Sequence, residues 1–154
     1  MTTNSRLQFG LKQGFRSGLE DDISAQLNRN GIPVLYEQLQ IPWEDRKIRR
    51  YTPDFVLPNG IIIESKGRFV TADRQKHLAI KAQYPALDIR FVFSRSASRI
   101  SKQSQTTYAK WCETKGFEYA DAAIPEAWLA EGCKAPRVAA VRRMCELKQQ
   151  EWLI

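Results

Sequence analysis

Two acidic residues and a lysine flank a predicted β-turn. Asp54 precedes the turn at 58–60, and Glu64 and Lys66 follow it. A three-residue turn sets Asp54 opposite Glu64, and directly opposed side chains on an antiparallel pair are about 5 Å apart on one face. Lys66 lies two residues beyond Glu64 and therefore on the same face. A turn of two or four residues would shift this pairing.

Two opposed carboxylates destabilise a sheet unless a positive charge compensates them. Lys66 compensates in part, and a divalent cation would do so more fully, because two carboxylates and several waters are the usual surroundings of Mg²⁺. Asp54 and Glu64 would hold the metal, with the backbone carbonyl of Ser65 as a further ligand. The metal would polarise a phosphate and activate a water, and Lys66 would position that water or neutralise phosphate charge. The alternative is an exposed hairpin with unrelated surface charges.

Glu20 is a further candidate, at a predicted helix start. The residues Ser17-Gly18-Leu19-Glu20 have the form of a capping box, and Gly31 is a natural stop, so they predict a helix between them. Glu20 would hold a second metal or help to orient the water. From spacing alone, the simpler interpretation is that Glu20 only completes the capping box.

The hydrophobic pattern around these residues predicts an α/β domain with a mixed sheet. Strands are expected at 32–37, 51–57, 61–66, 89–93 and 117–119, and helices at 72–83, 107–115 and after Pro136. Residues 38–50 are irregular and fit either a long strand arm or a linker between two halves of the fold. The hairpin register also sets Phe55 opposite Ile63 and Thr52 opposite Lys66.

Length and composition narrow the classes of protein. The 154 residues suit one domain, and 43% hydrophobic residues are enough for a core. No window approaches a membrane span, and residues 1–10 have no apolar signal core, so a cytoplasmic protein with no membrane partner is expected. Three cysteines without a CxxC pair, and His77 as the only histidine, argue against zinc and disulfides. The net charge of +7 favours a nucleic-acid partner, although ordinary basic solubility is the alternative.

The motif Pro53-Asp54, a gap, then Glu64-Ser65-Lys66 resembles the PD…(D/E)xK nuclease motif. The surrounding segments are similar to the phage endonuclease I family of Holliday-junction resolvases. The match runs in colinear order over about residues 14 to 130, through Phe15-Arg16-Ser17-Gly18-Leu19-Glu20-Asp21, Tyr51-Thr52-Pro53-Asp54-Phe55, Leu57-Pro58-Asn59-Gly60-Ile61, Glu64-Ser65-Lys66-Gly67, Lys76-His77-Leu78, Leu87-Asp88-Ile89-Arg90, Val92-Phe93-Ser94 and Ile124-Pro125-Glu126-Ala127-Trp128.

The resemblance implies a junction-resolving nuclease with a restriction-endonuclease-like fold, one or two Mg²⁺ or Mn²⁺ ions per site, and no organic cofactor. It implies catalytic roles for Glu20, Asp54, Glu64 and Lys66. It also implies an intertwined homodimer that exchanges strands across a bridge within about 38–50, so that Glu20 of one chain joins the other three residues of its partner. Residues 1–13 would then be a flexible N-terminus, 14–130 the nuclease domain and 131–154 a helical tail.

Branched DNA is recognised through its shape and its phosphate positions, which suits basic surface residues. The candidates for these contacts are Lys47, Arg49, Arg50, Arg68, Arg74, Arg95, Arg99 and Lys102. Taken singly, each is more often a solvated surface charge. Two other functions remain open: a nuclease of the same superfamily acting on linear duplex DNA in repair or restriction, and a non-catalytic DNA-binding module. Binding alone gains nothing from two acids facing phosphates, which argues against the module.

Overall fold

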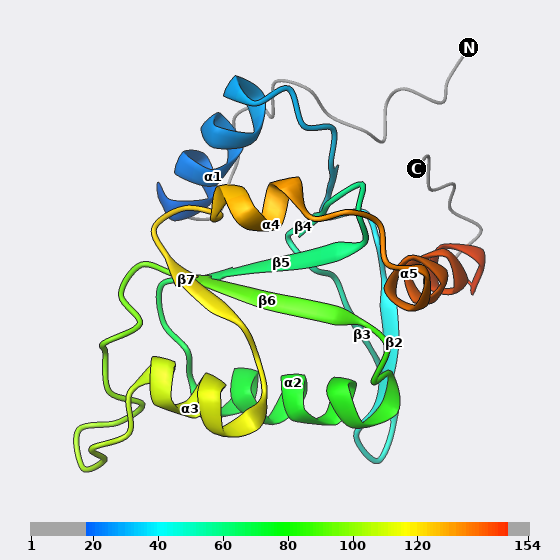
Figure 1. Ribbon diagram of the computed structural model, residues 1–154. Helices are drawn as coiled ribbons and strands as arrows, with labels where there is room; N and C mark the ends of the chain where they lie inside the picture. The colour runs from blue at the N-terminus through cyan, green and yellow to red at the C-terminus, as the bar shows by residue number, and fades with distance from the viewer. Residues whose placement is uncertain (1–17, 148–154) are drawn as a thin grey trace.

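The computed structural model describes residues 18–147 (Figure 1). The expected flexible N-terminus, the capping residue Ser17 and the end of the tail with Trp152 lie outside them. No helix in the described part is long and apolar enough to cross a bilayer. In chain order the elements are α1 (Gly18–Arg29), β1 (Leu35–Tyr36), β2 (Ile41–Glu44), β3 (Ile48–Tyr51), β4 (Phe55–Val56), β5 (Ile61–Lys66), α2 (Thr71–Gln83), β6 (Asp88–Phe93), α3 (Tyr108–Lys115), β7 (Tyr119–Asp121), α4 (Glu126–Ala130) and α5 (Ala135–Leu147).

Five strands form one mixed sheet in the order β1-β4-β5-β6-β7. The pairs β1–β4 and β4–β5 are antiparallel, and the pairs β5–β6 and β6–β7 are parallel. Each parallel pair needs a crossover, which α2 and α3 supply on one face, while α1 and α4 cover the other (Figure 1). The expected mixed sheet flanked by helices is therefore confirmed.

Strand β5 is buried on both faces. Ile61 and Ile63 pack into a cluster with Ile23 of α1, whereas Ile62 packs into a second cluster with Ile80 of α2. A strand covered on both sides has a continuous apolar run instead of an alternating one. The rigid, buried strand carries Glu64, Ser65 and Lys66 at its carboxyl end.

The turn at 58–60 has the predicted length. The Leu57 N–H donates to the Ile61 carbonyl at 2.8 Å, and Phe55 lies opposite Ile63. Gly60 has a φ of 90°, a left-handed conformation that glycine adopts without strain. The three-residue turn therefore fixes the register on which the placement of Glu64 depends.

The expected strand at 51–57 is wrong in its first half. Tyr51 belongs to β3 and pairs with Ile41 of β2, so the ladder to β5 begins only at Phe55. Pro53 interrupts the strand because proline has no N–H to donate to a ladder. Two backbone pairs expected from a continuous strand are consequently not formed, those of Asp54 with Glu64 and of Thr52 with Lys66.

Residues 38–50 fold mainly as a hairpin of β2 and β3, which pair only with each other among the described strands. Arg46 in its turn has a φ of 57°. The side chain of Gln83 ties the hairpin to α2, because it accepts from the Glu44 N–H at 2.8 Å and donates to the Glu44 carbonyl at 2.9 Å. A strand arm thus describes this segment better than an irregular linker.

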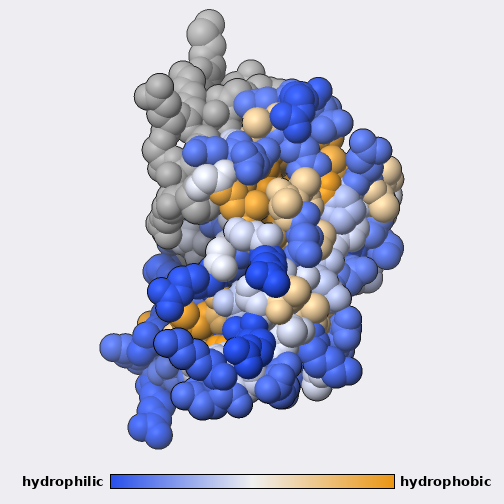
Figure 2. All heavy atoms as spheres, turned by 90° about the vertical axis from the view of Figure 1, so that its left-hand side faces the viewer, coloured by the Kyte–Doolittle hydropathy of each residue, from blue (hydrophilic) through white to orange (hydrophobic). Residues whose placement is uncertain are grey.

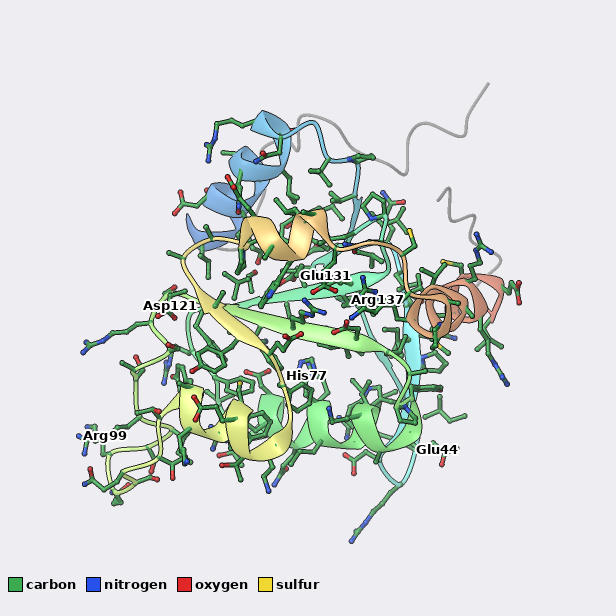
Figure 3. The ribbon with its side chains drawn as sticks, in the orientation of Figure 1. Glu44, His77, Arg99, Asp121, Glu131 and Arg137 are labelled. Atoms are coloured by element: carbon green, nitrogen blue, oxygen red, sulfur yellow. The ribbon has the colours of Figure 1, made fainter. Side chains whose placement is uncertain are left out.

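The helical tail packs on the body of the domain through α5. Val138, Val141 and Met144 are buried. Arg137 is also buried, and its Nε donates to the Asn59 carbonyl in the β4–β5 turn at 2.8 Å. Its Nη1 lies 2.8 Å from Glu131, which joins it in an ionic cluster (Figure 3). Helix α5 therefore supports the turn that sets the hairpin register.

We expect the stability of the fold to depend on pH through Glu131. Hydrogen bonds from Arg90 and Arg137 lower its pKa from the usual value of 4.5 to about 2. A carboxylate with a depressed folded pKa contributes stability above its unfolded pKa, and this contribution disappears as the pH falls through the folded pKa. We expect Glu131→Gln to reduce the unfolding free energy by about 2 kcal/mol at pH 7. The deficit should shrink between about pH 4.5 and pH 2.

Urea unfolding at neutral and acidic pH measures this difference. The matched control is Glu146→Gln on the exposed side of α5, which we expect to change stability by less than about 0.5 kcal/mol. A Glu131→Gln deficit that is the same at pH 7 and near pH 2 would contradict the assignment.

Candidate active site

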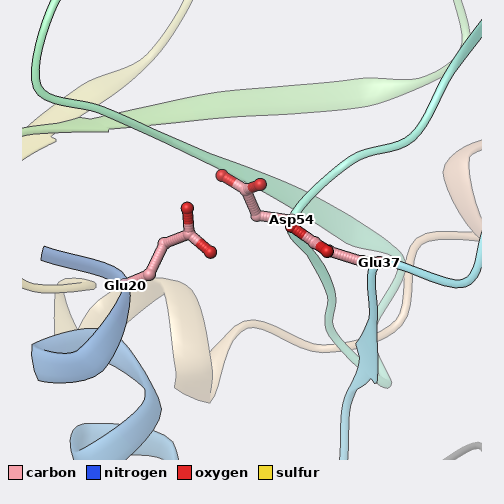
Figure 4. A group of neighbouring side chains, drawn as sticks. All are labelled: Glu20, Glu37 and Asp54. Carbon is pink, nitrogen blue, oxygen red and sulfur yellow. The ribbon is translucent and has the colours of Figure 1, made fainter. Parts of the chain in front are cut away.

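Three carboxylates from separate elements converge at one end of the sheet. Glu20 comes from the first turn of α1, Glu37 follows β1 and Asp54 precedes β4 (Figure 4). One oxygen of each lies within 4.8 Å of the others. Glu20 and Asp54 are both buried. The structure therefore brings together two residues singled out in the sequence and adds Glu37, which sequence reasoning missed.

The Asp54 carboxylate is held by Ser65, although Asp54 has no backbone pair with Glu64. Its Oδ2 accepts from the Ser65 N–H at 2.9 Å and from the Ser65 Oγ at 2.7 Å. The carboxylate thus continues the contact with β5 where the ladder ends. The sequence predicts the Ser65 carbonyl as a metal ligand, whereas Ser65 contacts Asp54 through its N–H and its hydroxyl. A metal contact by the carbonyl stays a prediction.

Glu64 lies deep in the site, with 4% of its surface exposed. Its Oε2 accepts from the Tyr51 hydroxyl at 2.5 Å, and its Oε1 lies 3.5 Å from the Lys66 ammonium. Burial and repulsion from Asp54 raise the pKa of Glu64 to about 8, although Lys66 and Tyr51 oppose the shift. A divalent cation would stabilise the ionised form, because it supplies positive charge inside the site.

Lys66 is shared by two acids. Its ammonium contacts Glu64 and also donates to Asp73 Oδ1 in the first turn of α2 at 3.1 Å. Burial opposes the charged form, but Glu64 and Asp73 outweigh it and raise the pKa of Lys66 above its usual value. Lys66 is therefore a cation in this site. Asp73 was missed in the sequence, where it is one of many acids at helix starts.

Two tyrosines orient the glutamates. The Tyr36 hydroxyl donates to Glu20 Oε2 at 2.6 Å, as Tyr51 does to Glu64. Burial, followed by the neighbouring glutamate, raises the pKa of each phenol, so both remain donors. His77 packs edge-on against Tyr51 with ring centroids 5.0 Å apart, and neither of its nitrogens has a hydrogen-bond partner within the described chain. Its place is in the aromatic core.

The donor set is made of oxygen atoms. Carboxylate oxygens are the ligands that Mg²⁺ and Mn²⁺ prefer, whereas zinc sites usually include Cys or His. The residues present therefore fit a hard divalent cation.

Seven of the eight basic candidates for DNA contact are exposed, and they fall on three segments. Lys47, Arg49 and Arg50 lie on the β2–β3 hairpin, Arg68 follows β5, and the loop 94–106 carries Arg95, Arg99 and Lys102. That loop starts where β6 ends, beside the carboxyl end of β5. Figure 2 looks onto this side of the molecule, and hydrophilic side chains cover most of its lower half. Figure 3 shows Arg99 at the edge of the molecule in that loop.

Arg74 differs from the other basic candidates because it is buried. Its guanidinium donates to the Phe69 carbonyl and, at 3.0 Å, to the Thr71 hydroxyl. These contacts hold the connection between β5 and α2. The structure thus buries Arg74 at this connection, and a DNA contact by Arg74 stays a prediction.

Comparison with known proteins places the chain in a family. The phage endonuclease I family model matches residues 1–149. The chain belongs to this family. It is 48% identical to endonuclease I of Escherichia phage T7 over 118 residues, and this aligned region covers 76% of this chain and 79% of the relative. It is 51% identical over 120 residues to endodeoxyribonuclease 1 of Enterobacteria phage T3, which covers 77% and 79%.

Proposed function

We propose that this phage endonuclease I homologue is a metal-dependent endonuclease that resolves four-way and other branched DNA junctions by paired phosphodiester hydrolysis. The observation that carries the proposal is the cluster of Glu20, Glu37 and Asp54, next to which buried Glu64 repels Asp54 and contacts the Lys66 ammonium. The names of the phage T7 and T3 relatives support an endonuclease, and the latter name supports DNA as the substrate.

Each residue of the site has a task in this reaction. Asp54, Glu64 and the Ser65 carbonyl would hold one Mg²⁺ or Mn²⁺, and Glu20, with Glu37 beside it, would offer ligands for a second. Such a cation would supply Lewis-acid chemistry, which polarises a phosphate and activates water. Lys66 neutralises charge that develops on the phosphate oxygens, because Glu64 and Asp73 keep its ammonium protonated.

The paired cuts require two sites, which a two-fold dimer supplies. The β2–β3 hairpin is the segment at which two chains exchange. Its strands pair only with each other among the described residues, so opening the turn at 45–47 would let the same pairs form between two chains. Each site would then receive Glu20 from one chain and Asp54, Glu64 and Lys66 from its partner.

Junction cleavage should depend on the divalent metal. Mg²⁺ and Mn²⁺ should support cleavage, and Ca²⁺ should allow the protein to bind the junction with little turnover, because its looser coordination positions the attacking water poorly. Cleavage and gel-shift assays in each metal measure both effects. Full cleavage in EDTA would contradict a metal-dependent mechanism.

Junction affinity should fall steeply as the salt concentration rises. A plot of the logarithm of the binding constant against the logarithm of the salt concentration should have a slope of about −0.9 per phosphate neutralised. If the hairpin contacts DNA, Arg49→Ala with Arg50→Ala should flatten the slope by up to about 1.8. The exposed pair Arg142→Ala with Arg143→Ala on α5 is the matched control and should leave it unchanged. An unchanged slope in the hairpin variant would place the DNA surface elsewhere.

The test of the function compares a four-way junction with its separate linear arms in Mg²⁺. Selective cleavage of the junction, at paired positions, is the expected result. Equal cleavage of the arms would favour a nuclease acting on linear duplex DNA, and binding without cleavage in Mg²⁺ would favour a non-catalytic module.

A further inference from the structure

Three carboxylates of the site, those of Glu20, Glu64 and Asp54, share a feature that the reaction itself does not require. One oxygen of each is bonded to a protein donor, since Tyr36 bonds Oε2 of Glu20, Tyr51 bonds Oε2 of Glu64 and Ser65 bonds Oδ2 of Asp54. On Glu64 the second oxygen, Oε1, faces Lys66 at 3.5 Å. An oxygen that accepts a short hydrogen bond is a poor second ligand, so each carboxylate is prepared to bind a cation through one oxygen.

The two tyrosines are fixed in place. Tyr51 is 2% exposed, its ring meets His77 edge-on, and the Lys76 ammonium lies 5.1 Å from its ring centroid. Tyr36 packs on Phe55 with ring centroids 5.2 Å apart. Neither hydroxyl can swing away from its glutamate without disturbing a packed ring. The hydrogen bonds are therefore preorganised before a metal arrives.

The number of oxygens per carboxylate distinguishes hard cations. Ca²⁺ takes six to eight oxygen ligands at about 2.3–2.6 Å and often binds a carboxylate through both oxygens. Mg²⁺ requires a near-octahedral arrangement at about 2.0–2.1 Å, keeps several waters and is bound by one or two carboxylates. A site that offers single carboxylate oxygens suits Mg²⁺ and withholds ligands from Ca²⁺.

We propose that Tyr36 and Tyr51 are positioning residues that select Mg²⁺ over Ca²⁺ by holding one oxygen of Glu20 and of Glu64. This inference rests on the proposed function, because it assigns the cation to the same site. It assigns the tyrosines no contact with the metal or with DNA. Their effect is transmitted through the glutamates.

The test measures metal binding by the full chain without DNA. Calorimetric titrations with MgCl₂ and with CaCl₂ give a dissociation constant for each cation in the wild type, Tyr51→Phe and Tyr36→Phe. In each variant the preference should shift toward Ca²⁺ by at least about fivefold, because the loss of a hydrogen bond to a charged group releases the second oxygen. The matched control is Tyr119→Phe, which removes a 2.8 Å hydrogen bond to the exposed Glu113 and should not change the preference.

The outcomes test the role of the tyrosines separately from the proposed metal-dependent function. If both cations weaken equally in both variants, or the preference stays unchanged, the tyrosines are only structural and the selectivity proposal is overturned. If Tyr51→Phe does not fold, the metal preference of Tyr36→Phe tests the same role at Glu20. A wild type that binds neither cation at millimolar concentration would instead overturn the proposed metal-dependent function, and with it the role of the tyrosines.

Discussion

Asp54→Ala is expected to reduce junction cleavage about a thousandfold while leaving junction affinity nearly intact. Asp54 is a proposed ligand of the first metal and lies beside Glu20, so its removal takes a ligand from that metal and disturbs the cluster. Losing about 4 kcal/mol of transition-state stabilisation corresponds to a thousandfold change in rate. Affinity should persist or rise slightly, because a negative charge that faces phosphates is removed. Glu64→Ala and Lys66→Ala should behave similarly, since both residues act in the same step.

Single-turnover cleavage and a gel-shift titration in Ca²⁺ measure the two effects separately. The control is Asp22→Ala, which removes an exposed acid from α1 outside the cluster and should leave the cleavage rate unchanged. Near-normal cleavage by Asp54→Ala would refute the assignment of this site. A parallel loss of junction affinity would show that Asp54 supports the DNA-binding fold instead of the chemistry.

Two inactive variants should restore activity to each other if chains exchange strands. Glu20→Ala and Asp54→Ala are mixed, unfolded and refolded together. Random pairing makes about half of the dimers mixed. In an exchanged heterodimer one composite site carries both defects, and the other takes Glu20 from one chain and Asp54 from the other, so it is intact. Such dimers should nick one strand of a junction and rarely resolve it.

The opposite outcome is equally specific. Within one described chain, Glu20 and Asp54 already lie together. If each site is built from a single chain, every heterodimer contains two damaged sites and no activity returns. An absence of rescue, with heterodimers verified by differently tagged chains, would exclude strand exchange and leave the nuclease assignment standing.

The sequence predicts the hairpin turn well because its signals are local. Pro58-Asn59-Gly60 between apolar runs specifies the turn, and the resulting register places Phe55 opposite Ile63. The break before Phe55 was also readable, since Pro53 cannot donate to a ladder. The β2–β3 hairpin was harder to foresee, because β3 is exposed at Ile48, Arg49 and Arg50 and lacks the alternation that marks a half-buried strand.

The partners of the catalytic candidates are tertiary and have no local pattern. Glu37, Tyr36 and Tyr51 join the site only after α1, β1 and the hairpin have packed around β5. Asp73 approaches Lys66 because the first turn of α2 begins close to the carboxyl end of β5. None of these four has a spacing that differs from that of an ordinary tyrosine or surface acid. A motif search finds the groups proposed to react, whereas the groups that orient them emerge from packing.

The central claim is that the carboxylates around Asp54 hold a divalent cation. The most direct measurement is anomalous diffraction from crystals of the protein grown with Mn²⁺. We predict a manganese peak in contact with Asp54 and Glu64, with a second peak toward Glu20 if two ions bind. A protein that cleaves junctions in Mn²⁺ but shows no manganese at Asp54, or shows it only at a distant site, would contradict the account.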